Sequence, residues 1–349
     1  MSSDRSGHRS YMRVAITGAT GNVGTALIKA LKAEPEVTEI LGIARRTPAA
    51  GASKLRYATA DIAVDDLVPL LSGYDAVVNL AWMIQPSHDE ARTFATNVHG
   101  SALVFEAAAR AGVKTIVHAS SVGAYSPGSK DTAVNENYPT GGIQTSFYSR
   151  HKAAVERELD RFERAHPQIR VVRLRPALIF QRQAGNEIRR LFMGRFFPAA
   201  LVNPKLIPIV PRTPGLVLQG VHAEDVADAY RRVILDPSAR GAYNIAAEPS
   251  LDADALGRLL DAKPVDVPPQ LLRRALALSW RARLQPSPEG WIDMALQSPL
   301  LDSSRARDEL GWTPTHDAGE ALLEVLGGIR DRATAGTPAL DEPGAYVER

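Results

Sequence analysis

Between residues 12 and 330, short runs of apolar and β-branched residues alternate with longer segments whose apolar residues recur at helical spacing. This alternation predicts strands joined by crossover helices, which is typical of a parallel sheet. The predicted strands are Met12–Thr17, Glu39–Ala44, Leu55–Thr59, Ala76–Leu80, Thr115–Ala119, Arg170–Leu174 and Leu216–Val221. Because such crossovers are nearly always right-handed, we expect an α/β fold with a doubly wound parallel sheet covered by helices on both faces.

The periodicity changes after the sixth predicted strand. Residues 181–215 carry several prolines, which interrupt regular elements, and 247–330 contains amphipathic helical patterns with no strand alternation between them. These helical patterns are Leu251–Leu260, Gln270–Leu284 and Ala318–Ile329. We expect residues 12–180, completed by 216–246, to form the core, and 181–215 with 247–330 to form a smaller, mainly helical substrate cap. Residues 1–11 and 331–349 lack periodic apolar residues and are predicted to be flexible tails.

Composition and charge exclude several classes of function. The 41 Lys and Arg against 39 Asp and Glu give a net charge of +2, too small for non-specific nucleic-acid binding. The absence of cysteine excludes disulfides and thiolate chemistry. No apolar run reaches the ~20 residues of a membrane span, and the polar start lacks the pattern of a secretory signal, so we expect a cytoplasmic protein. The basic amphipathic segment 271–280 is interpreted as a cap or subunit-contact helix rather than a membrane-surface helix, and a homodimer is possible.

Three glycines follow the first predicted strand and open a predicted helix, in the run Thr17-Gly-Ala-Thr-Gly-Asn-Val-Gly24. Glycine lets the backbone turn tightly and approach a pyrophosphate, whose charge the helix N-terminus stabilises. A strand, glycine turn and helix in this order are typical of a Rossmann-type dinucleotide site. The alternative is a generic glycine turn of an α/β protein. The residues predicted to bind the cofactor here are Gly18, Thr20, Gly21, Asn22, Val23 and Gly24.

The end of the second predicted strand bears on the choice of cofactor. An acidic residue at this place binds the ribose hydroxyls of NAD, but the sequence has Arg45 and Arg46 instead. Guanidinium groups bind phosphate in bidentate fashion, so they suit the 2′-phosphate of NADP. NADP(H) is therefore favoured over NAD(H), with a solvated basic loop as the alternative.

Tyr148 and Lys152 lie four residues apart in a helical pattern, which places both on one face of the helix. A phenol with an ordinary pKa near ~10 is a poor acid–base catalyst at neutral pH, but a nearby ammonium stabilises the phenolate. Without other evidence, such a pair most often lies on the exposed face of a helix and has no catalytic role.

Two hydroxyl residues, Ser120 and Ser121, end the fifth predicted strand, where a ligand crevice is expected. With these residues the sequence resembles the extended branch of the short-chain dehydrogenase/reductase superfamily, which includes the NAD-dependent epimerase/dehydratase family. The resemblance covers roughly residues 12 to 330. It rests on the glycine turn, Asp61-Ile62, Asn79-Leu80-Ala81, Asn97-Val-His-Gly100, the two serines, the Tyr-x-x-x-Lys pair, Val221-His-Ala-Glu-Asp-Val-Ala227 and Leu310-Gly-Trp-x-Pro314.

The resemblance implies roles for single residues. Ser121, four positions before Tyr125, is the implied catalytic serine, Tyr148 the proton donor or acceptor, and Lys152 the group that binds the nicotinamide ribose and lowers the tyrosine pKa. Asn97 is expected to support Lys152 through water. The other cofactor contacts implied are Asp61 with the adenine amino group, Ile62 with its ring, Leu80 and Ala81 along the cofactor channel, and Pro176 beside the nicotinamide. Local structural duties are the alternative for Asn97 and Asp61, because Asn and Asp often bond to nearby backbone.

The resemblance also implies a reaction, hydride transfer between the nicotinamide and a carbonyl or secondary alcohol of a small organic substrate. Val122 and Gly123 stand where dehydratases of this branch carry an Asp-Glu pair, which disfavours dehydration. Arg175-Pro176 is similar to members that act on apolar alcohols and ketones. The alternatives are a nucleotide-sugar epimerase with retained NAD, for which arginines 182, 189, 190 and 195 are a candidate diphosphate cluster, and a non-catalytic dinucleotide-sensing regulator.

Large apolar residues follow the fourth predicted strand and recur in the cap, and they are candidates for an apolar substrate pocket. They are Trp82, Met83, Ile84, Trp280 and Trp291. Ordinary core packing is the alternative. No metal is expected, because the histidines at 88, 99, 118 and 151 lack a paired ligand spacing.

Overall fold

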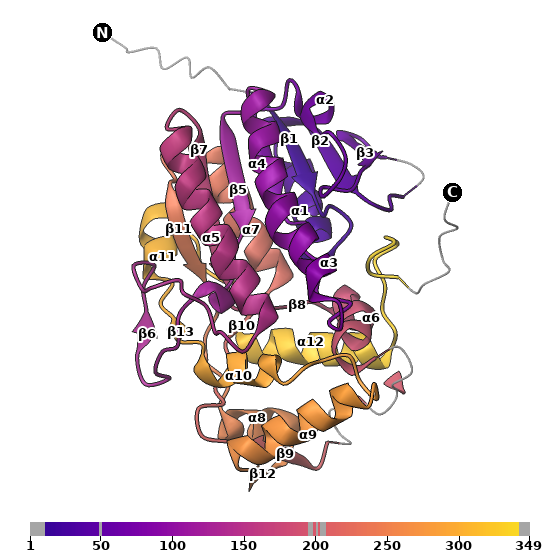
Figure 1. Cartoon of the computed structure of the whole chain (residues 1–349), viewed down its shortest axis with the longest axis vertical. Helices are drawn as coiled ribbons and strands as arrows, with labels where there is room; N and C mark the ends of the chain where they lie inside the picture. Colours follow the sequence, from indigo (N-terminus) through magenta and orange to yellow (C-terminus); the bar gives the residue numbers. More distant parts are fainter. Residues whose placement is uncertain (1–10, 49–50, 195–197, 200–201, 203–206, 342–349) are drawn as a thin grey trace.

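The computed structural model describes residues 11–48, 51–194, 198–199, 202 and 207–341. Its centre is a seven-stranded parallel sheet in the order β11-β7-β5-β4-β1-β2-β3 (Figure 1). The strands are β1 Met12–Thr17, β2 Val37–Ala44, β3 Leu55–Thr59, β4 Ala76–Asn79, β5 Thr115–Ala119, β7 Arg170–Pro176 and β11 Gly241–Ile245. The doubly wound α/β fold is confirmed, and six of the seven predicted strands lie in this sheet.

The seventh predicted strand, Leu216–Val221, was wrong. Only Gly220–His222 forms a strand there, β10, and it pairs with β8 (Leu178–Phe180) outside the large sheet. The residues before it turn, since the amide of Leu216 bonds to the carbonyl of Thr213. The sheet is completed by β11 instead, whose sequence Gly-Ala-Tyr-Asn-Ile has a single β-branched residue and so gives a weak strand pattern.

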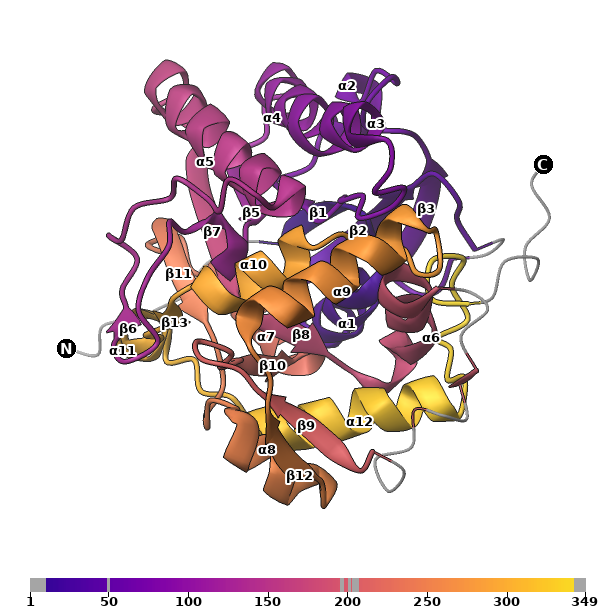
Figure 2. The same cartoon turned by 60° about the horizontal axis from the view of Figure 1, so that its bottom comes forward.

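Helices cover both faces of the sheet, and Figure 2 shows them as layers above and below it. The helices α1 (Asn22–Ala33) and α7 (Ala223–Leu235) pack against one face, and α4 (Ser101–Arg110) and α5 (Phe147–Ala165) against the other. Alternate residues of β1 serve the two faces: Val14 and Ile16 join the cluster with α1 and α7, and Ala15 joins the cluster with α4 and α5. Burial on both faces explains why these strands are continuously apolar.

The shorter elements on the core domain connect these layers. They are α2 Val68–Leu71, α3 Glu90–Phe94, the π-helical turn η1 Ala95–Gly100, the 3₁₀ turn η2 Val122–Ala124 and β6 Ala133–Val134. The helices α8 Ala253–Leu260, α9 Pro269–Arg281, α10 Gly290–Gln297 and α12 Ala318–Arg330 of the predicted cap lie at the carboxyl edge of the sheet (Figure 1). The helix α11 Ser304–Leu310 was also expected in the cap, but it packs beside β11 and α7 as part of the core. Between cap and core lie η3 Arg182–Ala184, α6 Gly185–Ile188 and η4 Arg189–Met193.

The cap is mainly helical, but the expectation that no strands lie between its helices was wrong. The strand β12 (Lys263–Asp266) pairs in parallel with β9 (Ile209–Arg212), and β13 (Leu300–Leu301) pairs with β6. These strands are short and partly exposed, and prolines at 211 and 264 mask their pattern in the sequence. The predicted basic amphipathic helix is α9, and it has no buried residue in this structure.

The C-terminal segment is also corrected. Residues 331–349 were expected to be a flexible tail, yet Leu340 is fully buried and Thr337 and Asp341 are nearly so. The segment folds back onto the glycine turn, where the Thr337 hydroxyl donates to the carbonyl oxygen of Thr20 at 2.8 Å. Residues 1–10 and 342–349 lie outside the described part of the chain, so the tail prediction is untested there. Among the described helices, none has both the length and the apolar character needed to cross a membrane.

Candidate active site

A cleft of about 310 Å³ opens where β1 and β4 lie side by side. From β1 the chain proceeds outward to β2 and β3, and from β4 it proceeds the other way to β5 and β7, so this is the switch point at which doubly wound sheets bind ligands. The cleft is lined by Gly18, Thr20, Gly21, Ile43, Ala44, Arg45, Arg46, Ala60, Asp61, Ile62, Leu80, Ala81, Trp82, Met83, Ile84, Gln85, Thr96, Glu187, Arg190, Leu191, Pro338 and Ala339.

The glycine turn fits a dinucleotide. Gly18 has φ of +70°, and a Cβ at this residue would lie 2.7 Å from the amide nitrogen of Ala81. A Cβ at Gly24 would lie 2.5 Å from the carbonyl oxygen of Gly18. At the N-terminus of α1, no side chain caps the helix and the first turn holds no acid, so its amide groups suit a pyrophosphate.

Most of the predicted cofactor residues line this cleft, and six do not. Those that line it are Gly18, Thr20, Gly21, Arg45, Arg46, Asp61, Ile62, Leu80 and Ala81. Asn22, Val23, Gly24, Tyr148, Lys152 and Pro176 lie outside the lining. Asn22 instead accepts a hydrogen bond from Gln181 at 2.7 Å, and Pro176 is buried within β7. Asp61 also serves a local structural duty, because its Oδ1 accepts from the amide of Ala63 at 3.0 Å.

Three candidate catalytic groups converge beside the cleft. Tyr148 lies in the first turn of α5, Lys152 one turn later, and Ser121 two residues after the end of β5, as the N-cap of η2. The Tyr148 ring packs against Gly123, two residues after Ser121, and the Ser121 hydroxyl is close enough to lower the pKa of Tyr148. The Lys152 ammonium lies 5.6 Å from the Tyr148 ring centre. Ser120 turns away and donates to Glu156 at 2.5 Å. Of the two serines, Ser121 is therefore the one in contact with Tyr148.

The electrostatics of this group differ from the expectation. Burial raises the pKa of Tyr148 to about 12, with the Ser121 hydrogen bond acting in the opposite direction. Burial also lowers the pKa of Lys152 to about 7, opposed by the charge of Glu156. The Lys152 ammonium donates to the carbonyl of Ala119 at 2.7 Å and lies 3.5 Å from the ring centre of Trp82. Because its nearest contacts are these two groups, the expected lowering of the Tyr148 pKa is not seen in this structure.

Asn97 lies fully buried in η1. Its side chain forms two hydrogen bonds with the backbone of Met83, accepting from the amide at 2.7 Å and donating to the carbonyl at 2.8 Å. Both contacts fix the segment after β4, which lines the cleft. Hydrogen bonding to nearby backbone, the alternative role for Asn97, thus accounts for the position of its side chain. Support of Lys152 through water stays a prediction.

Aromatic side chains surround Tyr148. The ring of Trp82 meets it edge-on at 5.7 Å between centres, and the ring of Trp291 lies 4.9 Å away. Phe192 packs against Trp291 at 4.9 Å. Trp280 has a different role, since it stacks on His88 at 4.1 Å and donates to Ser87 at 2.9 Å.

Sequence reasoning missed several residues of this region, among them Phe192, Glu187, Pro338 and Ala339. The carboxyl group of Glu187 lines the cleft, and burial raises its pKa to about 7. Glu187 and Phe192 lie in the proline-rich region without clear periodicity, and the other two lie in the segment that was excluded as a tail. Their place at the site comes from long-range packing, for which a single sequence carries no pattern.

The candidate diphosphate arginines contact protein groups. Arg182 pairs with Asp331 at 2.6 Å, and Arg190 donates to the carbonyl of Ala339 at 2.5 Å. Arg189 is buried and donates to Asn186 at 3.0 Å. Arg195 lies outside the described residues. The three described guanidiniums therefore hold the chain together around the cleft and do not form a solvated stripe.

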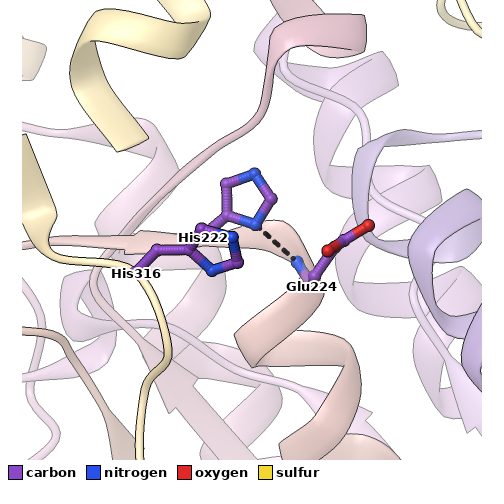
Figure 3. A group of neighbouring side chains, drawn as sticks. All are labelled: His222, Glu224 and His316. Atoms are coloured by element: carbon purple, nitrogen blue, oxygen red, sulfur yellow. Dashed lines mark hydrogen bonds between the residues drawn. The ribbon is translucent and has the colours of Figure 1, made fainter. Parts of the chain in front are cut away.

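One group of histidine and carboxylate residues has potential metal ligands within 4.8 Å of one another: His222, Glu224 and His316 (Figure 3). Each has a protein partner. The ring of His222 accepts from the backbone amide of Glu224 at 3.2 Å, the carboxylate of Glu224 pairs with Lys29 at 2.5 Å, and the ring of His316 lies 3.0 Å from Asp225. These contacts join the start of α7 to the segment before α12 and require no metal.

Comparisons with known proteins agree with this geometry. An uncharacterized protein of Mycobacterium tuberculosis is 26% identical over 95% of this chain, which spans only 32% of that relative. A dTDP-6-deoxy-L-talose 4-dehydrogenase (NAD(P)(+)) of Kitasatospora kifunensis is 27% identical over 91% of this chain and 96% of its own. The solved UDP-glucose 4-epimerase of Thermotoga maritima with UDP-glucose is 19% identical, covers 92% of this chain and 99% of its own, and superposes with a TM-score of 0.70.

The family model that matches the chain covers the sheet, the glycine turn and the Ser121, Tyr148 and Lys152 group, from residue 14 to residue 246. With that match over most of the core domain, the chain belongs to the NAD dependent epimerase/dehydratase family.

Proposed function

We propose that this chain is an NAD(P)-dependent oxidoreductase that transfers a hydride between the nicotinamide and a carbonyl or secondary alcohol of a small organic substrate. The observation that carries the proposal is the convergence of Ser121, Tyr148 and Lys152 beside Trp82 at the edge of the dinucleotide cleft. A serine hydroxyl and a tyrosine hydroxyl that converge in this way can polarise a carbonyl and deliver a proton to it.

Each side chain has a distinct task in the reductive direction. The cofactor, when bound, supplies the hydride. Ser121 donates a hydrogen bond to the carbonyl oxygen, and Tyr148 gives that oxygen its proton as negative charge develops. Lys152 in its ammonium form stabilises the tyrosinate that remains. Burial lowers the pKa of Lys152 to about 7, and the negative charge of a neighbouring tyrosinate favours the ammonium form. The overall change is one ketone, one hydride and one proton converted to one alcohol.

The surroundings of Tyr148 favour an apolar substrate. The rings of Trp82 and Trp291 pack against the Tyr148 ring, and Phe192 extends that aromatic surface. The described arginines nearby are engaged with protein carbonyl, carboxamide and carboxylate groups. An apolar ketone or alcohol thus matches this lining better than a diphosphate.

The function is tested by supplying the purified chain with reduced cofactor and a panel of apolar ketones, UDP-sugars and dTDP-sugars. Absorbance of the reduced nicotinamide reports turnover. We expect its steady loss with one class of ketone. If no ketone or secondary alcohol supports cofactor turnover while a nucleotide sugar is interconverted, the oxidoreductase assignment is wrong.

Nucleotide-sugar epimerisation with retained NAD is the second candidate. It is supported by the 26% identity to a UDP-glucose 4-epimerase of Mycolicibacterium smegmatis over 92% of this chain and 100% of that relative. An epimerase regenerates its cofactor in every cycle, so the purified chain would carry tightly bound oxidised cofactor and consume none. A dehydrogenase would exchange it with solution.

We further propose that NADP(H) is preferred over NAD(H). Arg45 and Arg46 line the cleft after β2, where no carboxylate stands to bind ribose hydroxyls.

Changing both arginines to alanine removes charge-assisted hydrogen bonds, so NADPH affinity should fall roughly tenfold or more while NADH affinity stays nearly constant. Equilibrium titration of nicotinamide fluorescence measures both. Arg110→Ala, on the exposed end of α4, is the matched control. Tighter binding of NADH than NADPH to the unaltered chain would contradict the preference.

A further inference from the structure

The C-terminal segment 331–341 is fixed to the glycine turn at the opposite end of the chain. The Thr337 hydroxyl donates to the carbonyl oxygen of Thr20 at 2.8 Å, and Thr337 is only 7% exposed. Thr20 is one of the residues that line the cleft beside the predicted pyrophosphate site. A single buried hydrogen bond thus joins this segment to the loop on which dinucleotide binding depends.

Further contacts make the segment a defined structure. The carboxylate of Asp341 accepts hydrogen bonds from the amides of Ala335 at 3.2 Å and Gly336 at 3.1 Å, which closes a small loop. Leu340 lies fully buried beneath this loop. Arg190, from η4, donates to the carbonyl oxygens of Ala339 and Asp341. The segment is therefore held from both sides, by the core through Thr20 and by the cap side through Arg190.

The segment also forms part of the wall of the cleft. Pro338 and Ala339 line it together with Gly18, Thr20 and Gly21. A dinucleotide whose pyrophosphate lies on the glycine turn would therefore have these two residues beside it. The same three-residue stretch, 337–339, thus both bonds to the glycine turn and borders the cleft.

We propose that residues 331–341 form a clasp that retains the dinucleotide and slows its release. The proposal rests on the cofactor cleft of the proposed function and adds a binding element that lies outside the family match, which ends at residue 246. Its physical basis is local: the clasp must loosen from Thr20 and Arg190 before the ligand can leave past Pro338 and Ala339. A clasp made of a few hydrogen bonds and one buried leucine opens far more readily than the whole domain unfolds.

The test measures NADPH dissociation by stopped-flow displacement, with nicotinamide fluorescence as the signal. A chain ending at Ala333 keeps α12 and its terminal contact, since the amide of Ala333 bonds to Gly328 within the helix end. We expect its dissociation rate to rise about tenfold. Thr337→Val removes only the hydroxyl, and the loss of one neutral hydrogen bond should raise the rate by roughly two- to tenfold. Thr334→Val, on an exposed threonine of the same segment, should leave it unchanged.

The outcomes separate the clasp from the cofactor assignment. If the unaltered chain binds neither NADPH nor NADH, the proposed function fails. If it binds them, and both the shortened chain and Thr337→Val release NADPH within about twofold of the unaltered rate, the clasp is wrong and the cofactor assignment stands. Should the shortened chain fail to fold, the NADPH dissociation rates of Thr337→Val and Thr334→Val alone decide whether the clasp exists.

Discussion

Replacing Tyr148 with phenylalanine should lower kcat by roughly 10²- to 10⁴-fold on the ketone found by screening, because this is the range that a positioned proton donor contributes. The change removes one oxygen and leaves the ring, so the packing against Trp82 and Trp291 is retained. Tyr148 is not among the residues that line the dinucleotide cleft, so the NADPH dissociation constant should change less than about threefold. Steady-state kinetics and fluorescence titration measure the two quantities.

The matched control is Tyr138→Phe. The Tyr138 hydroxyl donates to the backbone carbonyl of Pro127 at 2.7 Å, away from Ser121. This variant loses the same atom and should keep its turnover within about twofold. If Tyr148→Phe also retained turnover within that range, Tyr148 would not be the proton donor. A chain that binds the dinucleotide but turns over no substrate would instead support the sensing alternative.

The parts of this molecule that the sequence predicts well are those set by local pattern. Strands such as β1 and β5 are buried on both faces, so their apolar runs stand out, and the glycine turn is recognisable because Gly18 and Gly24 have no room for a Cβ. The pairing of Tyr148 with Lys152 follows from helical spacing alone. The choice of Ser121 over Ser120 came from family likeness, and the contact with Tyr148 agrees with it.

What the sequence did not predict depends on contacts between distant segments. β11 has a weak strand pattern and joins the sheet through pairing with β7. The segment 331–341 lacks periodicity, and its order depends on Thr20 and Arg190, which lie far away in the chain. The position of the Lys152 ammonium depends on Trp82 and on the carbonyl of Ala119. Such features follow from the assembled tertiary structure, and propensity or spacing does not encode them.

A buried ionic network lies directly beneath the catalytic group. Glu156, one turn after Lys152 in α5, is 1% exposed. Its carboxylate accepts from Ser120 at 2.5 Å, from Arg175 at 2.8 and 2.9 Å, and from Arg173 at 3.0 Å. These contacts tie α5 to β7 and to the residue next to Ser121. Glu156 thereby positions both the helix that carries Tyr148 and the strand end that carries the serine.

The charge state of Glu156 gives the network a defined pH dependence. Burial alone raises the pKa of this carboxyl group, but Arg175, Arg173 and Ser120 lower it more, to about 2, against an ordinary value of 4.5. Since the pKa of Glu156 is lower in the folded chain than in the unfolded chain, its carboxyl group binds a proton more readily when the chain is unfolded. Its contribution to stability is fully present above about pH 4.5 and is lost as the pH falls toward 2.

Glu156→Ala should therefore lower the free energy of unfolding by about 3–5 kcal/mol at neutral pH, because it leaves Arg175 buried without its carboxylate. Chemical denaturation followed by circular dichroism measures this. Glu158→Ala in the same helix removes an exposed pair with Arg161 and should cost less than about 1 kcal/mol. The difference between the unaltered chain and Glu156→Gln should shrink as the pH falls from 5 toward 2. If Glu156→Ala were no more destabilising than Glu158→Ala, Arg175 would have to be satisfied by its contacts with Tyr125 and Glu136, and the network would not depend on this carboxylate.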